Sequence, residues 1–134
     1  MQLSLQGITA AARRVLAVVL FFGLASPASW AQAPAQVETI LKSMLTATQA
    51  NSLPDFVAAG DPAFKAGMTK PMLDSVSQQL APRLKGGYTA SFLGKLNQQA
   101  FAVYLWKLEF KDGKDDVLVT MAVRDGMVGG FWLR

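Results

Sequence analysis

Two residue types that many enzymes use as nucleophile, base or metal ligand are absent from this sequence, which has no cysteine and no histidine. Ser-His-Asp and Cys-His catalysis, zinc sites built from Cys or His, and thiol redox chemistry are therefore excluded. The glycine pairs Gly86-Gly87 and Gly129-Gly130 lack the spacing of a phosphate-binding loop. Carboxylate or tyrosine chemistry is what remains, and the sequence predicts no cofactor.

The carboxylates fall where acids usually have a structural role. Asp55 and Asp61 stand at expected helix starts, where a carboxylate caps the helix. Glu109 lies within a strand on a side that is turning polar, and Asp74 occupies a solvent-facing helix position. Four more aspartates lie in or beside expected turns: Asp112, Asp115, Asp116 and Asp125. We therefore predict no catalytic residue.

Several aromatic and sulfur-containing side chains in the second half of the chain are suited to lining a ligand pocket. Their alternative role is core packing, with a tyrosine hydroxyl or an indole N–H bonded to the backbone. The sequence leaves both roles open. The candidates for a ligand pocket are Tyr88, Tyr104, Trp106, Met121 and Trp132.

Residues 1–31 have the organisation of a secretory signal peptide. Arg13 and Arg14 precede an uncharged apolar run over residues 15–24, and small residues follow it. The run is about ten residues long, whereas a helix needs about 20 to span a bilayer. We expect cleavage after Ala31, because cleavage two residues later would leave a proline first. A retained N-terminal anchor is the alternative.

The mature chain would then be a periplasmic or secreted protein with no membrane span. Residues 32–36 form an Ala/Pro tail that we expect to be mobile, and residues 37–134 form one α+β domain. Without Arg13 and Arg14 there are 11 basic and 9 acidic residues, which lowers the net charge from +4 to +2. No cluster of Lys and Arg marks a nucleic-acid surface, so no nucleic-acid partner is predicted.

Helix signals occupy the chain before Tyr88. One apolar stripe with the i, i+3, i+4, i+7 spacing of a helix face predicts a helix from Val37 to about Ala50. A short helix over residues 53–60 and a single turn from Pro62 follow. Thr69 is a suitable cap for a third main helix, which ends near Gly86.

Strand signals occupy the rest of the chain, over residues 88–96, 101–110, 117–123 and 127–133. Asp112-Gly113 and Asp125-Gly126 are hairpin turn signals between the last three of these strands. The predicted fold class is α+β, with N-terminal helices packed on a four-stranded antiparallel meander.

The hairpin turns predict which side chains share a face of the sheet. A turn at Asp112-Gly113 places Leu108 opposite Val117 on the face turned to the helices, with Tyr104 and Trp106. A turn at Asp125-Gly126 places Trp132 on that face too. A bulge at Gly129-Gly130 would exchange Phe131 with Trp132. The other face carries the interface candidates Val103, Leu105, Leu118, Thr120, Phe131 and Leu133.

This second face is apolar, which is unusual for a sheet solvated on one side. A contiguous apolar patch on a soluble protein usually marks an interface, so we predict a homodimer formed face to face through the sheet. Coverage of the face by the N-terminal helix or tail is the alternative.

The order of elements resembles the nuclear-transport-factor-2-like superfamily, the cone-shaped fold shared with ketosteroid isomerase and the SnoaL-like cyclases. The resemblance covers about residues 37–133 and is closest to small secreted bacterial members of unknown function. It rests on fold determinants such as the short Phe56 helix, Gly60-Asp61, Met68-Thr69 and the closing run over residues 123–130. It implies a curved, cystatin-like sheet around a long helix, a possible pocket in the cone, and often a dimer.

The sequence therefore favours a non-catalytic binding or interaction module. Its ligand would be a small apolar molecule in the cone, or its partner a protein or second copy on the sheet. The alternative function is a small cofactor-independent isomerase or lyase of the ketosteroid-isomerase type, which would need a carboxylate base inside the cone. A purely structural cell-envelope protein is a third possibility.

Overall fold

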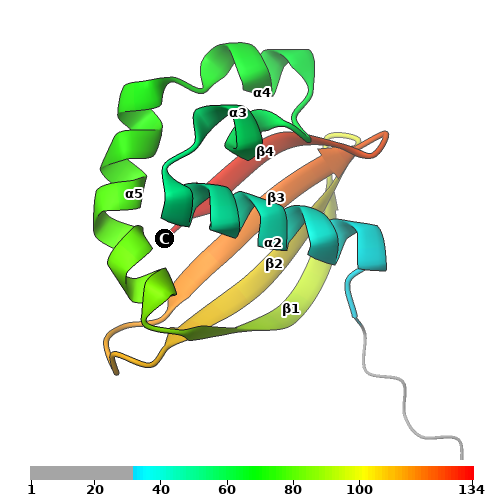
Figure 1. The fold of residues 1–134 in the computed structure, drawn as a ribbon. Helices are drawn as coiled ribbons and strands as arrows, with labels where there is room; N and C mark the ends of the chain where they lie inside the picture. The colour runs from blue at the N-terminus through cyan, green and yellow to red at the C-terminus, as the bar shows by residue number, and fades with distance from the viewer. Residues whose placement is uncertain (1–31) are drawn as a thin grey trace, which may run out of the picture. The chain divides into compact units, whose positions relative to one another are not determined.

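The computed structural model describes residues 32–134, and the predicted signal peptide at residues 1–31 lies outside them. The helices in this range are α2 (Ala35–Ala50), α3 (Leu53–Val57), α4 (Pro62–Gly67) and α5 (Lys70–Lys85). The strands are β1 (Tyr88–Gln98), β2 (Phe101–Phe110), β3 (Val117–Arg124) and β4 (Met127–Leu133). They pair antiparallel in the order β1-β2-β3-β4. The predicted α+β class is confirmed (Figure 1).

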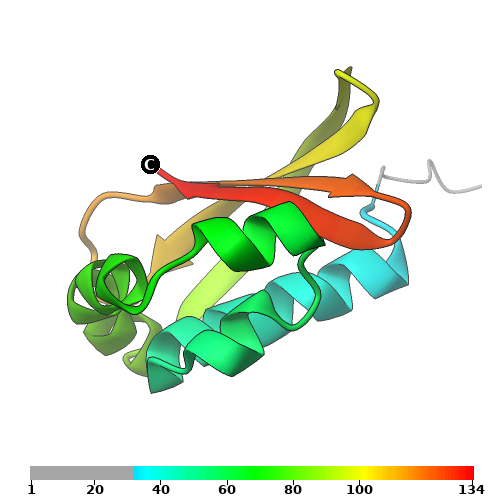
Figure 2. The same ribbon diagram turned by 90° about the horizontal axis from the view of Figure 1, so that it is seen from above.

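Helices α2, α3 and α5 lie on one side of the sheet, which we call the inner side; the opposite surface is the outer face (Figure 2). The curved strands pack along one side of α2, in a helix-on-sheet arrangement (Figure 2). No helix within residues 32–134 combines the length and apolar character that crossing a bilayer requires.

Helix α2 starts earlier than its apolar stripe predicts. It begins at Ala35, and the N–H of Glu38 donates to the carbonyl oxygen of Pro34 over 3.0 Å. Ala33 is already buried in the core. Residues 35 and 36, which the sequence assigns to the tail, belong to the helix, because Pro34 has a backbone conformation that can precede a helix and its carbonyl begins the hydrogen-bond ladder.

The core lies between the apolar stripe of α2 and the inner side of the sheet. Leu41, Met44 and Leu45 are almost completely buried there, opposite Trp106 and Leu108 of β2. The even-numbered residues of β2 face this core, as the sequence predicts. Burying a side chain of this size stabilises the folded state by about 1.5–3 kcal/mol.

Helix α5 is attached to α2 by a buried polar contact. The hydroxyl of Ser77 donates to the carbonyl oxygen of Thr48 over 2.7 Å, and the Thr48 hydroxyl donates to the carbonyl oxygen of Met44 over 2.8 Å. Both side chains are buried, so each hydroxyl needs such a partner. This contact fixes how the two long helices cross.

The β2–β3 pairing has the predicted register, with Leu108 opposite Val117 and Trp106 opposite Val119. The connection is longer than a two-residue turn. The β2–β3 pairing ends at Leu108 and Val117, and residues 111–116 belong to neither strand. A tight turn would oppose Glu109 to Asp116, which is unfavourable. Instead, Arg83 of α5 binds this loop from the helix side.

The β3–β4 turn is the predicted two-residue one, with positive φ at Asp125 (53°) and Gly126 (75°). Beyond Val123 and Val128 the register shifts by one residue at Gly129. This bulge reverses the predicted faces of the last residues of β4. Phe131 and Leu133 pack against the core, and Trp132 lies on the outer face opposite Thr120.

The two edges of the sheet differ. Val128 in β4 exchanges backbone hydrogen bonds of 2.8 Å with the segment between α3 and α4, through Ala59 and Asp61. Strand β1 forms the other edge, with a bulge between Phe92 and Gly94. The tip of the β1–β2 hairpin bends away from the helices (Figure 2). The outer face is therefore hollowed beside this tip.

Candidate functional site

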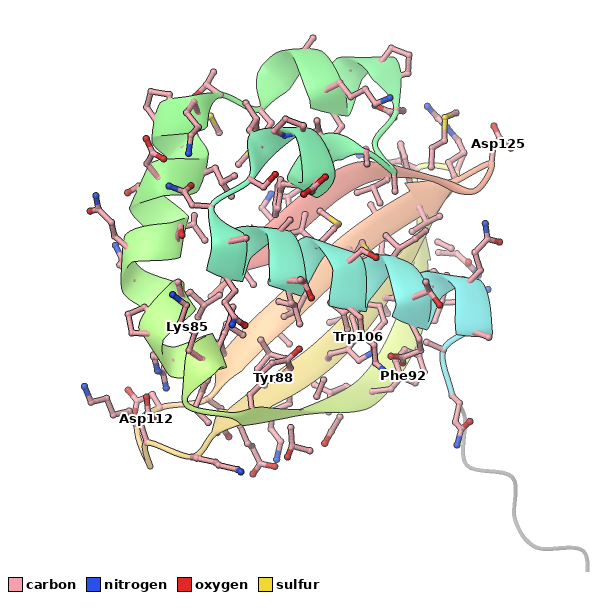
Figure 3. The ribbon with its side chains drawn as sticks, viewed as in Figure 1. Lys85, Tyr88, Phe92, Trp106, Asp112 and Asp125 are labelled. Carbon is pink, nitrogen blue, oxygen red and sulfur yellow. The ribbon has the colours of Figure 1, made fainter. Side chains whose placement is uncertain are left out.

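On the inner side, the predicted pocket residues pack against one another. Trp106 and Met121 are fully buried, Tyr104 is nearly so, and Tyr88 is half-buried. The rings of Phe92, Tyr104 and Trp106 lie 5.7 to 6.3 Å apart between centroids. Tyr88, Phe92 and Trp106 occupy the side of the sheet turned to α2 (Figure 3). None of these inner side chains lines the surface groove described below, whereas the fifth pocket candidate, Trp132, lies on the outer face and does line it.

One carboxylate reaches this aromatic cluster and is absent from the sequence-based candidates. The Nε1–H of Trp106 donates to Oε1 of Glu38 over 2.9 Å, from β2 to the first turn of α2. The two residues are 68 positions apart, so no local pattern reveals the contact. It satisfies the polar atom of a buried indole, which is a common structural role.

Two aspartates have their pKa values lowered rather than raised. The ammonium of Lys70, 2.6 Å away, and then the amide of Asn51, 2.8 Å away, lower the pKa of Asp74 by hydrogen bonding to its carboxylate. The Arg83 guanidinium lowers the pKa of Asp112 in the same way. A catalytic acid of the isomerase type needs a shift in the opposite direction.

Other polar groups also have structural roles. Asp61 caps α4 by accepting from the N–H of Phe64 over 2.7 Å, as predicted. Burial raises the pKa of the Tyr88 hydroxyl, and the ring lies 6.4 Å from that of Phe110. Within residues 32–134, no group of three or more acidic side chains has the arrangement of a metal site.

The outer face carries four of the six predicted interface residues. Val103, Leu105, Leu118 and Thr120 lie there, and Val103 is only 6% exposed although no helix of residues 32–134 covers this side. Phe131 and Leu133 do not belong to this face, because the Gly129 bulge turns them inward. Trp132 replaces them, and it is 47% exposed.

A groove of about 810 Å³ opens on this face over β2, β3 and β4. Its floor is formed by Val103, Ala122 and Gly129, and its aromatic sides by Phe101 and Trp132. The polar groups that line it are Gln98, Gln99, Thr120 and Arg134. Ligand sites usually combine an apolar surface of this size with a few convergent polar groups.

Two glycines let the aromatic rings lie close to the strand. A Cβ atom at Gly129 would stand 2.4 Å from the Phe101 ring, and one at Gly130 would stand 2.1 Å from the Trp132 indole. Real Cβ atoms do not approach carbon atoms so closely, so any other residue would displace the rings. The glycine pair therefore determines the shape of the groove as well as the bulge.

Charges of both signs surround the groove. Arg134 lines the groove, and the Arg124 guanidinium lies 4.3 Å from the centroid of the Phe101 ring at its border. On the other side, Oδ2 of Asp61 lies 3.2 Å from the position that a Cβ atom at Gly129 would take. None of the residues that line the groove is acidic. Farther along the same face, Lys107 and Glu109 form an exposed ion pair of 3.1 Å.

A smaller hollow of about 250 Å³ separates α5 from the ends of β3 and β4. Ser75, Gln79 and Arg83 of α5 face Val117 and Leu133 across it. Arg83 is already engaged: it binds Asp112 over 2.7 Å and the carbonyl oxygen of Asp115 over 2.7 Å. This hollow is too small for most ligands, whose sites are typically at least about 300 Å³.

Comparison with known proteins adds a likeness of fold. No family model matches the chain, and no curated protein matches it. Among solved structures, it is similar to an uncharacterized cystatin fold protein from Novosphingobium aromaticivorans. The two are 12% identical with a TM-score of 0.37, and the match covers 76% of this chain and 99% of the other. At this level the similarity supports no argument about function.

Proposed function

We propose that the protein is a secreted, non-catalytic binding module that works through the outer face of its sheet. The observation that carries the proposal is the contrast between the two sides of β2. On the inner side, Tyr104, Trp106 and Leu108 are buried in packing. On the outer side, an apolar surface with a groove of about 810 Å³ stays open.

Secretion to the periplasm or the exterior is the part of the proposal that rests on the sequence. Arg13, Arg14 and the apolar run over residues 15–24 support it, together with the small residues that end at Ala31. A fold related to the nuclear-transport-factor-2-like superfamily is likewise proposed from the order of elements. The resemblance is to secreted members of that superfamily. The role of the open outer face is argued from this chain alone.

A second copy of the chain is the protein partner that we propose for this face. Leu105 and Leu118 present half-buried apolar side chains over the two central strands, where a soluble sheet normally alternates with polar residues. A surface that pairs with itself around a twofold axis forms the commonest type of oligomer. The dimer would cover the apolar atoms that the described helices leave open.

Glu38 is the residue that bears on the isomerase alternative. Its carboxylate is the acid that contacts the aromatic cluster, but it is occupied by the indole N–H of Trp106. A base must be free to take a proton from a substrate within hydrogen-bond reach. We therefore assign Glu38 to holding α2 on the sheet.

Native mass spectrometry of the protein purified from its own host tests the proposal as a whole. The expected result is a chain that begins at Gln32, in equilibrium between one and two copies. A retained ligand would be recorded in the same spectrum. Sedimentation velocity at high micromolar concentration is the complementary measurement, and a strict monomer there would contradict the dimer. A full-length chain in the spectrum would contradict secretion with cleavage.

A further inference from the structure

We propose that two copies of the chain pair their outer faces with the strands running in the same direction, so that Trp132 of each copy fills a gap at Gly94 of the other. The inference rests on the dimer of the proposed function and adds its arrangement. It names the contact on which the dimer depends. It also determines which strand of one copy covers which strand of its partner.

The pairing of the strands arranges the outer face in rows that run across the sheet. One row joins Leu96 of β1 to Gly130 of β4. The next row joins Gly94 of β1 to Trp132 of β4. Both rows cross β2 and β3 between these ends, so each begins at one edge of the sheet and ends at the other.

The two ends of the second row are complementary in shape. At the β4 end, Trp132 is 47% exposed, and its indole rests against Gly130 of the first row. At the β1 end, the bulge leaves open space: apart from the adjacent residues, nothing lies within 4 Å of the position of a Cβ atom at Gly94. Leu96, in the neighbouring row, is 47% exposed. A large aromatic ring at one end therefore matches a gap with an apolar neighbour at the other.

A twofold axis that runs along the strands, between β2 and β3, brings these ends together. Rotation about this axis keeps the strand direction and exchanges the edges of the sheet, so β1 of one copy covers β4 of its partner. Each row then lies over the same row of the other copy in reverse order, in the aligned packing usual for two sheets. Gly94 faces the partner's Trp132, and Leu96 faces the partner's Gly130, on which that indole rests. The contact occurs twice, as in any isologous pair.

The distribution of polar residues along the strands argues against an axis that runs across them. Leu96, Leu105 and Trp132 lie in the rows near the β1–β2 tip, whereas Lys107 and Glu109 lie toward the other end of the same face. An axis across the strands would place each charged residue over the apolar rows of the partner, where a buried charge is costly. The axis along the strands keeps the polar rows of both copies together at one end, in contact with water.

The shape of the β1–β2 hairpin supports the same arrangement. Its tip bends away from the helices, toward the side on which the second copy lies (Figure 2). Because β1 covers β4 of the other copy, each tip reaches the start of that strand. The first residue of β4, Met127, is 42% exposed and therefore available for this contact.

Cross-linking tests the arrangement directly, because the chain has no cysteine of its own. Three variants carry one cysteine each at an exposed strand position: Gln98→Cys, Met127→Cys and Thr89→Cys. Gln98 pairs with Phe101, whose ring Arg124 contacts, and Arg124 pairs with Met127. With the axis along the strands, Gln98 therefore faces the partner's Met127. With the axis across the strands, it faces the partner's Thr89.

Equimolar mixtures of these variants are treated with a short bis-maleimide at a concentration where sedimentation reports a dimer. We expect Gln98→Cys with Met127→Cys to give more cross-linked dimer than any single variant or the mixture of Gln98→Cys with Thr89→Cys. Two results overturn the arrangement: the mixture that contains Thr89→Cys gives the most product, or no mixture exceeds the single variants.

Substitutions at the contact test its strength. Trp132→Ala and Leu96→Ala should each raise the dissociation constant of the dimer by about tenfold or more, because each removes apolar contacts that occur twice. Gly94→Val fills the gap and should have the same effect, although its own copy has room for the side chain. Met72→Ala removes an equally exposed apolar side chain from α5 and should dimerise like the parent. Melting temperatures verify that each variant is folded. A dimer that tolerates both Trp132→Ala and Gly94→Val overturns the arrangement.

Sedimentation of the parent chain separates this inference from the proposed function. If the parent is a strict monomer at high micromolar concentration, the dimer fails and its arrangement fails with it. If the parent is a dimer that Leu105→Glu separates, the outer face is the interface. Cross-linking through Thr89, or tolerance of both Trp132→Ala and Gly94→Val, would then overturn the arrangement alone.

Discussion

The indole of Trp106 in β2 and the carboxylate of Glu38 in α2 are joined by a hydrogen bond of 2.9 Å. The indole is fully buried, whereas Glu38 stands at the margin of the interface. This contact ties the first helix to the centre of the sheet. It also gives a hydrogen-bond partner to the indole nitrogen of Trp106, which is the largest side chain in the core.

Removing the Glu38 acceptor should destabilise the fold. We expect Glu38→Ala to lower the free energy of unfolding by about 1–3 kcal/mol, because the buried indole N–H loses its partner. Glu38→Gln keeps an acceptor oxygen and should cost less. Urea unfolding monitored by circular dichroism measures both. If the two variants are equally stable, the hydrogen bond has no part in stability.

A methyl group at Gly130 should displace Trp132. The Cβ of Gly130→Ala would stand 2.1 Å from the indole, so the ring or the strand must move. We expect a loss of about 1–3 kcal/mol and a change in tryptophan fluorescence. Gly94→Ala is the matched control in another strand, since nothing lies within 4 Å of its Cβ. A stable Gly130→Ala variant with unchanged fluorescence would contradict the close contact.

Charging the outer face should separate the proposed dimer. Leu105→Glu places a carboxylate in the middle of the apolar surface, and burying it against a second copy would be unfavourable without a partner charge. Sedimentation velocity should therefore report a monomer. Thr46→Glu adds the same charge at an exposed position of α2, away from the outer face, and is the control for general charge effects. A dimer that survives Leu105→Glu does not use this face.

The ion pair between Arg83 and Asp112 should make stability depend on pH. Arg83 binds this carboxylate over 2.7 Å and lowers its pKa below the ordinary value of 3.8. The unfolded chain therefore takes up a proton first as the pH falls. The contribution is complete above the ordinary pKa and is lost as the pH falls through the lowered one.

Asp112→Asn measures this contribution. The difference in melting temperature between parent and variant should be largest near neutral pH and shrink as the pH falls below about 4. The difference should also shrink in the Arg83→Gln background, where the partner is already absent. A difference that does not vary with pH would show that Asp112 acts through its turn geometry, by accepting from the N–H of Lys114 over 2.9 Å.

Much of the sheet could be predicted because strand side chains alternate strictly. The pairing of Leu108 with Val117 follows from the Asp-Gly signal and the period of two, and it holds although the loop itself is wider. The faces of Phe131 and Trp132 could not be predicted. They depend on the bulge at Gly129, where the ring of Phe101 from β2 takes the space of a side chain, and this is a contact between distant parts of the chain.

The helices, too, could be predicted only in part from the sequence. The stripe of α2 is predicted by spacing alone, but Ser77 is buried in α5, and its burial depends on a carbonyl group 29 residues away. The groove was not predicted, since it requires both the bent tip of the β1–β2 hairpin and the bulge in β4. The contact of Glu38 with Trp106 likewise depends on tertiary structure.

The bridge between Val128 and the segment at Ala59 and Asp61 limits how copies of the chain can join edge to edge. Fibre growth requires two open edges on every unit, so that each added unit presents a new one. Here the β4 edge is interrupted at Val128, and β1 offers the longer free edge. The bridge therefore shortens the free part of the β4 edge, so a further strand would add more readily to β1 than to β4, which disfavours growth of a strongly apolar sheet from both edges at once.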